Sequence, residues 1–395
     1  MSKFHPLRIA HIARETRDAV ALTFDVPPAL AQTFRFVQGQ HLTLRADIAN
    51  DDLRRSYSIC SAVQDGTLRI AVKKAPGGTF STWVNERLEA GQTIEVMPPM
   101  GHFNVPLDAA NRKHYLGFAA GSGITPLLSI IKTTLMTEPH SRFTLFYGNR
   151  SSAAVIFKEE LSDLKDTFLA RLNLVYVMSR EPQDIALLNG RIDRQKTDAL
   201  LSHWLDLAEV DTAFICGPDG MMQAVSTSLQ EHGFPKSRIK IELFAASIPK
   251  HEHKTHAEPP PGSTECAVTA IIDGAAREFT LEKTKENIID AALRQGIELP
   301  YSCKGGVCST CRAKLVEGEV DMDVNFALED YEVARGFVLC CQSYPVTDKV
   351  VVDFDQTACA AAPQQKLHHR EHRGHRGQAQ KDFLGFLRAL CVLCG

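Results

Sequence analysis

Hydrophobic and polar residues alternate in short runs over residues 1–108, and Gly, Pro and Asp interrupt the runs. Runs such as HLTLRA, TLRIAVK and QTIEVMPP have the period of two that buries one face of a strand. Several short strands in succession are typical of an antiparallel barrel or sandwich. Residues 1–108 are therefore predicted to form an antiparallel β domain, a barrel or a sandwich.

The pattern changes over residues 109–247, where the hydrophobic runs become continuous. HYLGFAA, FTLFYG, LNLVYVMS and TAFICG are each followed by a helical segment, and IKIELFAAS, at residues 239–247, closes the region. Strands that alternate with helices form a parallel sheet joined by crossover connections. We therefore expect an α/β domain here.

A segment rich in proline and histidine, residues 248–263, follows this domain. It holds four prolines and no hydrophobic periodicity, which predicts a linker. Residues 264–356 then combine two strand-like runs, a helical run (NIIDAALRQG), a cysteine-rich loop and a last strand (VVVDFD), so they are expected to form an α+β domain. Residues 357–395 are basic and of low complexity in HHREHRGHRG, and we predict a disordered tail.

Composition narrows the function classes. The chain has 395 residues and a net charge of −3, which argues against nucleic-acid binding, since phosphate contacts need a basic excess. It has no apolar run long enough to cross a membrane, and its first residues lack the apolar core of a signal peptide. We therefore expect a cytoplasmic protein, whose 11 cysteines are not structural disulfides.

Five of those cysteines fall between residues 303 and 341. Cys303, Cys308 and Cys311 have the spacing C-x4-C-x2-C, and Cys341 follows 30 residues later. This is the plant-type spacing of a [2Fe–2S] cluster, with thiolates as its ligands. A zinc site would favour paired CxxC motifs, and unrelated buried thiols would not gather in this way. The spacing favours Cys341 over the adjacent Cys340, which is interpreted as a packed thiol.

Two motifs in the first domain suit a flavin. In the sequence RSYS, Tyr57 can stack on an aromatic ring system, Ser58 can bond its edge, and Arg55 can pair with a phosphate. In GGTFS, Gly78 and Ser81 stand at the start of a helical segment, where a diphosphate can bind. A surface strand or an ordinary turn would explain either motif alone. Together, in one β domain, they indicate a flavin diphosphate.

The second domain carries glycine-rich turns where buried strands end. Gly121, Gly123 and Thr125 belong to AAGSGITP, which follows one strand and opens a helix, and Cys216 and Gly217 end another strand. Ligands of open α/β sheets bind at the carboxyl ends of the strands. A plain tight turn and a buried small thiol are the competing interpretations.

Arginine and hydroxyl side chains end two further strands of that domain. Arg150 follows one strand, and Ser179 with Arg180 ends another. Such groups suit a ribose 2′-phosphate, which favours NADP over NAD. Solvated surface arginines remain the alternative.

Taken in order, these motifs give the chain a family resemblance. From about residue 4 to residue 356 it resembles the ferredoxin–NADP reductase superfamily, and more closely the reductases of phenylacetyl-CoA-oxidising systems with a C-terminal plant-type ferredoxin domain. The resemblance implies an antiparallel FAD-binding β-barrel over residues 1–108, a β-grasp ferredoxin domain and the cofactors FAD, NADPH and [2Fe–2S]. It places Ser58, Cys216 and Glu242 at the reaction centre and Phe244 beside the flavin. The motifs that carry it are RSYS, GGTFS, AAGSGITP, YGNRS, SRE, CGPDGMM and CKGGVCSTC.

The resemblance also implies an activity and a partner. The chain would be an NADPH-dependent oxidoreductase that passes electrons through FAD and the cluster to an oxygenase component, a di-iron enzyme that oxidises phenylacetyl-CoA. A reductase for another oxygenase or for a hybrid-cluster protein is an alternative. A redox sensor without turnover is another, although a sensor would not need the complete nucleotide set.

Overall fold

The computed structural model describes residues 3–244, 264–283 and 285–356. The predicted linker, residues 248–263, and the predicted tail, residues 357–395, therefore lie outside the described residues. Within the described part of the chain, no helix is long and apolar enough to cross a membrane.

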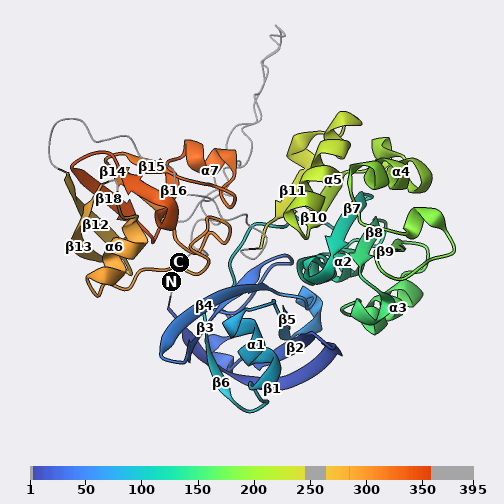
Figure 1. Ribbon diagram of the computed structural model, residues 1–395, viewed down its shortest axis with the longest axis horizontal. Coiled ribbons are helices and arrows are strands. Elements are labelled where there is room, and N and C mark those ends of the chain that lie inside the picture. Colours follow the sequence, from blue (N-terminus) through green and yellow to red (C-terminus); the bar gives the residue numbers. More distant parts are fainter. Residues whose placement is uncertain (1–2, 245–263, 284, 357–395) are drawn as a thin grey trace, which may run out of the picture. The chain divides into compact units, whose positions relative to one another are not determined.

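The N-terminal domain is an antiparallel sheet of six strands in the order β4-β3-β6-β1-β2-β5 (Figure 1). An antiparallel bridge between Ile59, which follows β4, and Ile70 of β5 joins the two end strands, so the sheet closes as the predicted barrel. Helix α1 packs against β5, β2 and β3. The elements are β1 (His5–Thr16), β2 (Ala19–Asp25), β3 (His41–Ile48), β4 (Asp51–Ser58), β5 (Leu68–Lys73), α1 (Thr79–Glu86) and β6 (Thr93–Val96).

The second domain is a parallel sheet of five strands in the order β11-β10-β7-β8-β9, as its continuous hydrophobic runs predict. The chain proceeds from β7 outward in one direction and then returns to the other side of β7, so the topological switch point lies between β7 and β10. The elements are β7 (His114–Ala120), α2 (Ile124–Thr137), β8 (Arg142–Asn149), α3 (Lys158–Thr167), β9 (Leu172–Met178), α4 (Arg194–Trp204), β10 (Thr212–Cys216), α5 (Asp219–Glu231) and β11 (Ile239–Glu242).

The last strand of this sheet lies at its edge. Within the closing run IKIELFAAS, β11 covers Ile239–Glu242, and Leu243 and Phe244 follow outside the strand. Among the described residues β11 pairs with β10, and this pairing ends where Cys216 lies opposite Glu242. The carboxyl ends of the two strands therefore lie side by side.

The third domain is a mixed sheet of five strands in the order β13-β12-β18-β14-β16, with α6 packed against β13. Strands β12 and β18 are parallel and the other neighbours antiparallel, as expected for a β-grasp domain. The elements are β12 (Glu265–Ile272), β13 (Ala275–Glu282), α6 (Ile288–Arg294), β14 (Arg312–Glu317), β15 (Val320–Met322), α7 (Asp330–Ala334), β16 (Phe337–Leu339), β17 (Ser343–Pro345) and β18 (Lys349–Asp353), with β15 and β17 forming a separate pair.

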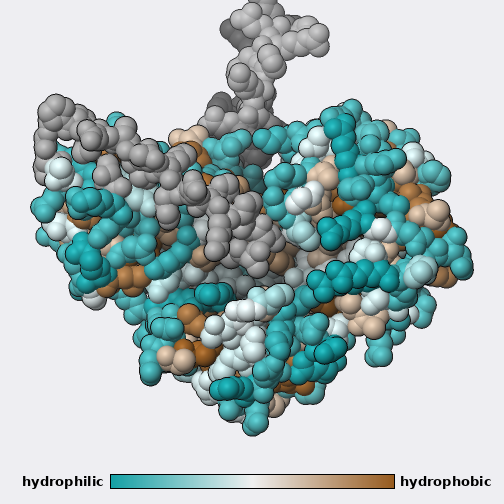
Figure 2. Space-filling view, viewed as in Figure 1, coloured by the Kyte–Doolittle hydropathy of each residue, from teal (hydrophilic) through white to brown (hydrophobic). Residues whose placement is uncertain are grey.

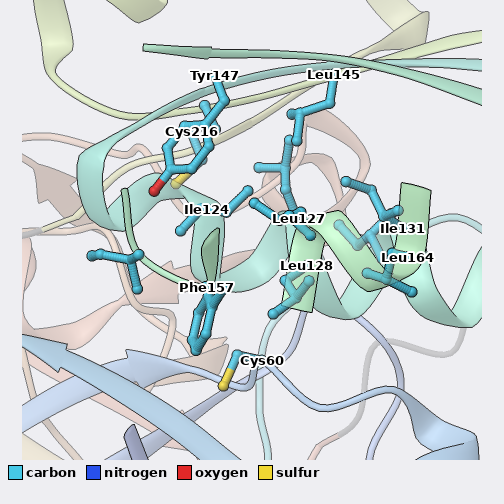
Figure 3. Packing of buried hydrophobic residues seen from close by; sticks show 14 of the residues in the cluster. Cys60, Ile124, Leu127, Leu128, Ile131, Leu145, Tyr147, Phe157, Leu164 and Cys216 are labelled. Atoms are coloured by element: carbon cyan, nitrogen blue, oxygen red, sulfur yellow. The ribbon is translucent and has the colours of Figure 1, made fainter. Parts of the chain in front are cut away.

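Hydrophobic clusters form the cores of the first two domains, and one cluster spans both. Among the described residues, one cluster fills the barrel and another lies under α4 and α5. The spanning cluster lies under α2 and α3 and includes barrel residues such as Cys60 and Phe103. Figure 3 shows Phe157 and Cys60, which both belong to this shared cluster. On the face seen in Figure 2, hydrophobic residues are scattered among hydrophilic ones over the described part of the chain.

Candidate functional site

The structure brings the four predicted cluster cysteines into contact. The thiols of Cys308 and Cys341 both contact that of Cys303, and the thiol of Cys341 also contacts that of Cys311. Three of the four side chains are buried, and Cys303 is half-buried. Four soft sulfur donors from one loop and one distant turn are the donor set that a [2Fe–2S] cluster requires.

The cluster loop curls tightly because several of its residues have left-handed backbone. Lys304, Gly306 and Ser309 all have positive φ. At Gly306 an added Cβ would lie 3.0 Å from the carbonyl oxygen of Val324, so glycine also fits the space. The curl directs amides at sulfur: the Gly305 N–H donates to Cys303 Sγ at 3.3 Å.

Contacts with neighbouring groups favour the thiolate of Cys303. Hydrogen bonds from Cys308 and Cys341, together with the Gly305 and Val307 amides, lower the pKa of the Cys303 thiol against the effect of its burial. Among the described residues, no group of three or more His, Cys, Asp or Glu side chains has the arrangement that holds a metal ion. The fit to a cluster therefore rests on the pairwise thiol contacts and the sulfur donor chemistry.

Cys340 and Cys341 occupy one short 3-10 turn, Cys340–Gln342, and their side chains have different neighbours. Cys341 contacts two of the other thiols, and Gln342 Nε2 donates to its sulfur at 3.6 Å. Cys340 is fully buried, and burial raises the pKa of its thiol well above the ordinary value. This geometry supports Cys341 as the fourth ligand and Cys340 as a packed thiol.

The RSYS motif forms the end of β4. Tyr57 lies near the α1 residue Phe80, with ring centroids 6.0 Å apart, and burial raises the pKa of the Tyr57 hydroxyl. The Arg55 guanidinium donates to the carbonyl oxygen of Arg54 at 2.7 Å and is otherwise exposed. An aromatic ring and an exposed cation next to a helix start fit the requirements of a flavin diphosphate.

At the start of α1, the Ser81 hydroxyl stabilises its own turn. It accepts from the Ala75 amide at 3.0 Å and donates to the Gly78 carbonyl at 3.3 Å. The turn preceding α1 is thereby fixed. The proposed contacts of Gly78 and Ser81 with a pyrophosphate remain predictions.

The three candidate reaction-centre residues come together from three separate strands. Ser58 Oγ at the end of β4 donates to Glu242 Oε2 at 3.3 Å, and Glu242 pairs in register with Cys216 of β10. Burial of the Glu242 carboxyl raises its pKa to about 8, which the hydrogen bond from Ser58 opposes. Phe244, two residues further on, packs against the shared hydrophobic cluster.

The pKa of Glu242 leads to a pH prediction. A carboxyl with a raised pKa stays neutral up to about pH 8, and above that pH its carboxylate repels the negative charge that a flavin gains on reduction. We expect the rate of flavin reduction by a nicotinamide nucleotide to fall by about tenfold as pH rises through 8. Rapid-mixing measurements of flavin absorbance across this range would show the transition. Glu242→Gln should flatten the profile, whereas an unchanged profile in that variant would assign the transition elsewhere.

The glycine-rich turn after β7 lies against the end of β10, at the switch point of the sheet. A Cβ on Gly123 would lie 1.9 Å from the carbonyl oxygen of Cys216, so only glycine fits. Thr125 Oγ1 donates to the Ser122 carbonyl at 2.9 Å and fixes the first turn of α2. The turn begins at Gly121 and lies against Gly217, which follows the neighbouring strand. Its position and its close packing are those of a nucleotide-binding turn.

Cys216 itself is fully buried in the hydrophobic cluster. Burial raises the pKa of its thiol well above the ordinary value, and the Glu242 charge adds to this. Figure 3 shows its side chain beside Tyr147 and Ile124. The side chain is a neutral, packed thiol, and a role beside the nicotinamide remains a prediction.

The residues predicted to bind a 2′-phosphate lie on neighbouring strand ends. The amides of Ser179 and Arg180 donate to the carbonyls of Asn149 and Arg150, at 2.9 and 2.8 Å, and both arginines are exposed. Glu181 follows directly after Ser179 and Arg180 in the SRE motif, and its carboxylate accepts from the Ser152 amide at 2.8 Å.

The fold and this arrangement of thiols, strand ends and glycine turns define an oxidoreductase that combines a flavin, a nicotinamide nucleotide and an iron–sulfur cluster. Family models agree: the oxidoreductase FAD-binding domain matches residues 6–105, the oxidoreductase NAD-binding domain residues 118–227, and the 2Fe-2S iron-sulfur cluster binding domain residues 270–346.

Relatives and a solved structure match most of the chain, across all three domains. The chain is 46% identical to a subunit of the 1,2-phenylacetyl-CoA epoxidase of Escherichia coli K12, over 91% of this chain and 100% of that one. It is 32% identical to the 3-ketosteroid-9-alpha-monooxygenase ferredoxin reductase component of Rhodococcus rhodochrous, over 88% of this chain and 96% of that one. The structure of phthalate dioxygenase reductase has the same fold, with a TM-score of 0.54 at 24% identity, covering 89% of this chain and 98% of that one.

The chain belongs to the family of oxygenase reductases in the ferredoxin–NADP reductase superfamily that carry a C-terminal [2Fe–2S] ferredoxin domain. As such it binds FAD, a nicotinamide nucleotide and the cluster, and it transfers electrons to an oxygenase component.

Proposed function

We propose that this chain is the reductase of an oxygenase that epoxidises phenylacetyl-CoA. The observation that carries the proposal is the match to a phenylacetyl-CoA epoxidase component over that protein's full length, at 46% identity. A 3-ketosteroid-9-alpha-monooxygenase reductase component and a glycine betaine monooxygenase reductase subunit match at 32% and 29% identity. Since a reductase never handles the oxygenase's substrate, the substrate is inferred from the partner alone.

When bound, the flavin accepts a hydride from the nucleotide and hands electrons on singly, while the cluster carries one electron at a time. The chain's own residues bind and orient these groups. Ser58 and Glu242 meet at the strand ends beside the nucleotide turn, and the four thiols converge on one loop. The eight cysteines in the described residues are all free thiols, which supports our proposal that the protein works in the cytoplasm.

Reconstitution would test the proposed partner. The purified chain, loaded with its cofactors, would be mixed with the oxygenase components of a phenylacetyl-CoA epoxidase, NADPH and phenylacetyl-CoA. We expect NADPH oxidation coupled to epoxide formation. Cytochrome c reduction without epoxide would show a reductase for another oxygenase, and the absence of both would favour a sensor.

We further propose that NADPH, rather than NADH, is the electron donor. Arg150 and Arg180 stand exposed on adjacent strand ends, with Ser179 beside them, a set that suits a phosphate. Glu181 is the carboxylate nearest to Arg180 in sequence. The amide and the hydroxyl of Ser152 donate hydrogen bonds to the Glu181 carboxylate, which lower its pKa.

Arg180→Ala is therefore expected to lower kcat/KM for NADPH by about tenfold, since a charge-assisted hydrogen bond to the phosphate is lost. Its kcat/KM for NADH should stay near the original value. Steady-state kinetics with both nucleotides measure this, and Arg191→Ala, which removes an exposed arginine outside these two strand ends, is a suitable control. An equal loss with both nucleotides would remove the case for a 2′-phosphate site.

A further inference from the structure

The outer face of the β3–β4 hairpin is polar along its length. Strand register pairs Thr43 with Ser56 and Arg45 with Arg54, and these side chains alternate with Leu42 and its neighbours in the barrel core. A polar outer face on a barrel strand is ordinary when water covers it. Here Thr43 is only 1% exposed and Arg54 only 4%, so another part of the chain covers it.

The covering part is the cluster loop, and hydroxyl groups make the contact. Ser302 Oγ lies 2.9 Å from Ser56 Oγ, which lies 3.2 Å from Thr43 Oγ1. Thr43 Oγ1 in turn lies 3.5 Å from Thr310 Oγ1. Four hydroxyls therefore form a continuous chain, Ser302–Ser56–Thr43–Thr310, whose longest link is the last.

The members of this hydroxyl chain are sequence neighbours of the predicted cluster ligands and of the flavin motif. Ser302 directly precedes Cys303, and Thr310 directly precedes Cys311, so each end is next to a predicted cluster ligand. Ser56 lies between Arg55 and Tyr57 of the flavin motif. The sequence separations of 246 and 267 residues show that tertiary folding alone creates the contacts.

Charged groups flank the hydroxyl chain on the same hairpin. Glu298 Oε1 accepts from Arg45 and from Arg54, each at 2.8 Å, and the Arg54 guanidinium lies 4.1 Å from the ring centroid of Tyr301. Long side chains with an exposed carboxylate hold two surfaces together but tolerate small shifts. Short hydroxyl side chains tolerate shifts less well, because they have little conformational freedom and the two in the middle, Ser56 and Thr43, each make two of the contacts.

We propose that Thr43, Ser56, Ser302 and Thr310 are positioning residues that fix the cluster loop against the flavin-binding strand β4. They take part in no bond making. One electron leaves one group as one arrives at the other, and the hydroxyl chain sets the separation across which it passes. The inference rests on the chain's role as an electron-transfer reductase and is independent of which oxygenase accepts the electrons.

Thr43→Val tests the proposal, because valine keeps the shape and removes the hydroxyl. After rapid mixing of the cofactor-loaded protein with NADPH, flavin reduction should keep its rate, and bleaching of the cluster should slow by about five- to tenfold, the loss expected for one buried hydrogen bond. Thr43→Ser restores the hydroxyl and should restore the rate. Thr23→Val, on strand β2 of the same barrel, should change neither rate.

Amide hydrogen exchange gives a second readout that needs no turnover. In Thr43→Val, and in Ser56→Ala as an independent break of the hydroxyl chain, residues 302–311 should exchange faster while the cluster's absorption is retained. Equal slowing of flavin reduction and cluster bleaching, or unchanged bleaching and exchange in both variants, would overturn the proposal. Neither readout uses an oxygenase, so failure here is distinct from failure of the proposed partner.

Discussion

Cys341→Ser is expected to abolish the visible absorption of the iron–sulfur cluster, whereas Cys340→Ser leaves it in place. The thiol of Cys341 is hydrogen-bonded with the thiols of Cys303 and Cys311. The neighbouring Cys340 is a buried thiol whose pKa is raised by that burial. A serine hydroxyl is a harder donor than thiolate and matches iron and sulfide poorly. Absorption spectra and iron content of the two purified variants measure the difference.

Flavin content serves as the control in this comparison. Because Cys340 and Cys341 both belong to the third domain, FAD binding by the barrel should be the same in both variants. Loss of the cluster in Cys340→Ser with retention in Cys341→Ser would reverse the assignment of the fourth ligand. Loss in both would show that the short turn needs both thiols.

Gly123→Ala is expected to have the second large effect, the loss of flavin reduction by the nicotinamide nucleotide. The new Cβ would lie 1.9 Å from the Cys216 carbonyl oxygen and 3.0 Å from the Gly217 nitrogen, so the glycine turn and the end of β10 must separate. Such overpacking costs about 1–3 kcal/mol of stability, and displacing the nucleotide by about 1 Å can slow transfer by about a hundredfold. Rapid-mixing kinetics and thermal unfolding measure the two effects.

Gly220→Ala is the matched control for this substitution. Gly220 lies four residues after Cys216, in the first turn of α5, and an added Cβ there has nothing within 4 Å. It should reduce flavin at the original rate and unfold at the same temperature or slightly higher. If Gly123→Ala behaved in the same way, the contact between the turn and β10 would not constrain the nucleotide site.

Periodicity and spacing were enough to predict the fold class. The alternating runs predicted an antiparallel β domain, and the continuous hydrophobic runs predicted the parallel sheet, because burial on one face or on both leaves a local pattern. The run IKIELFAAS does not show where its strand ends. In the structure β11 stops at Glu242, where its partner β10 ends opposite it at Cys216, so pairing between strands set that boundary.

For the candidate site, too, some features follow from the sequence and others only from the tertiary structure. The sequence by itself determined the cysteine spacing and the glycine turns, because these chemistries need particular residues close together in the chain. The spacing also favoured Cys341 over Cys340, and the contacts of the Cys341 thiol agree with it. Only the tertiary structure decided that Ser58 meets Glu242 across 184 residues. It alone decided, too, that Thr43 and Ser56 meet Thr310 and Ser302. Such contacts depend on which face of each element packs against a distant one, and a hydroxyl on a strand has the same sequence pattern whether water or a cluster loop covers it.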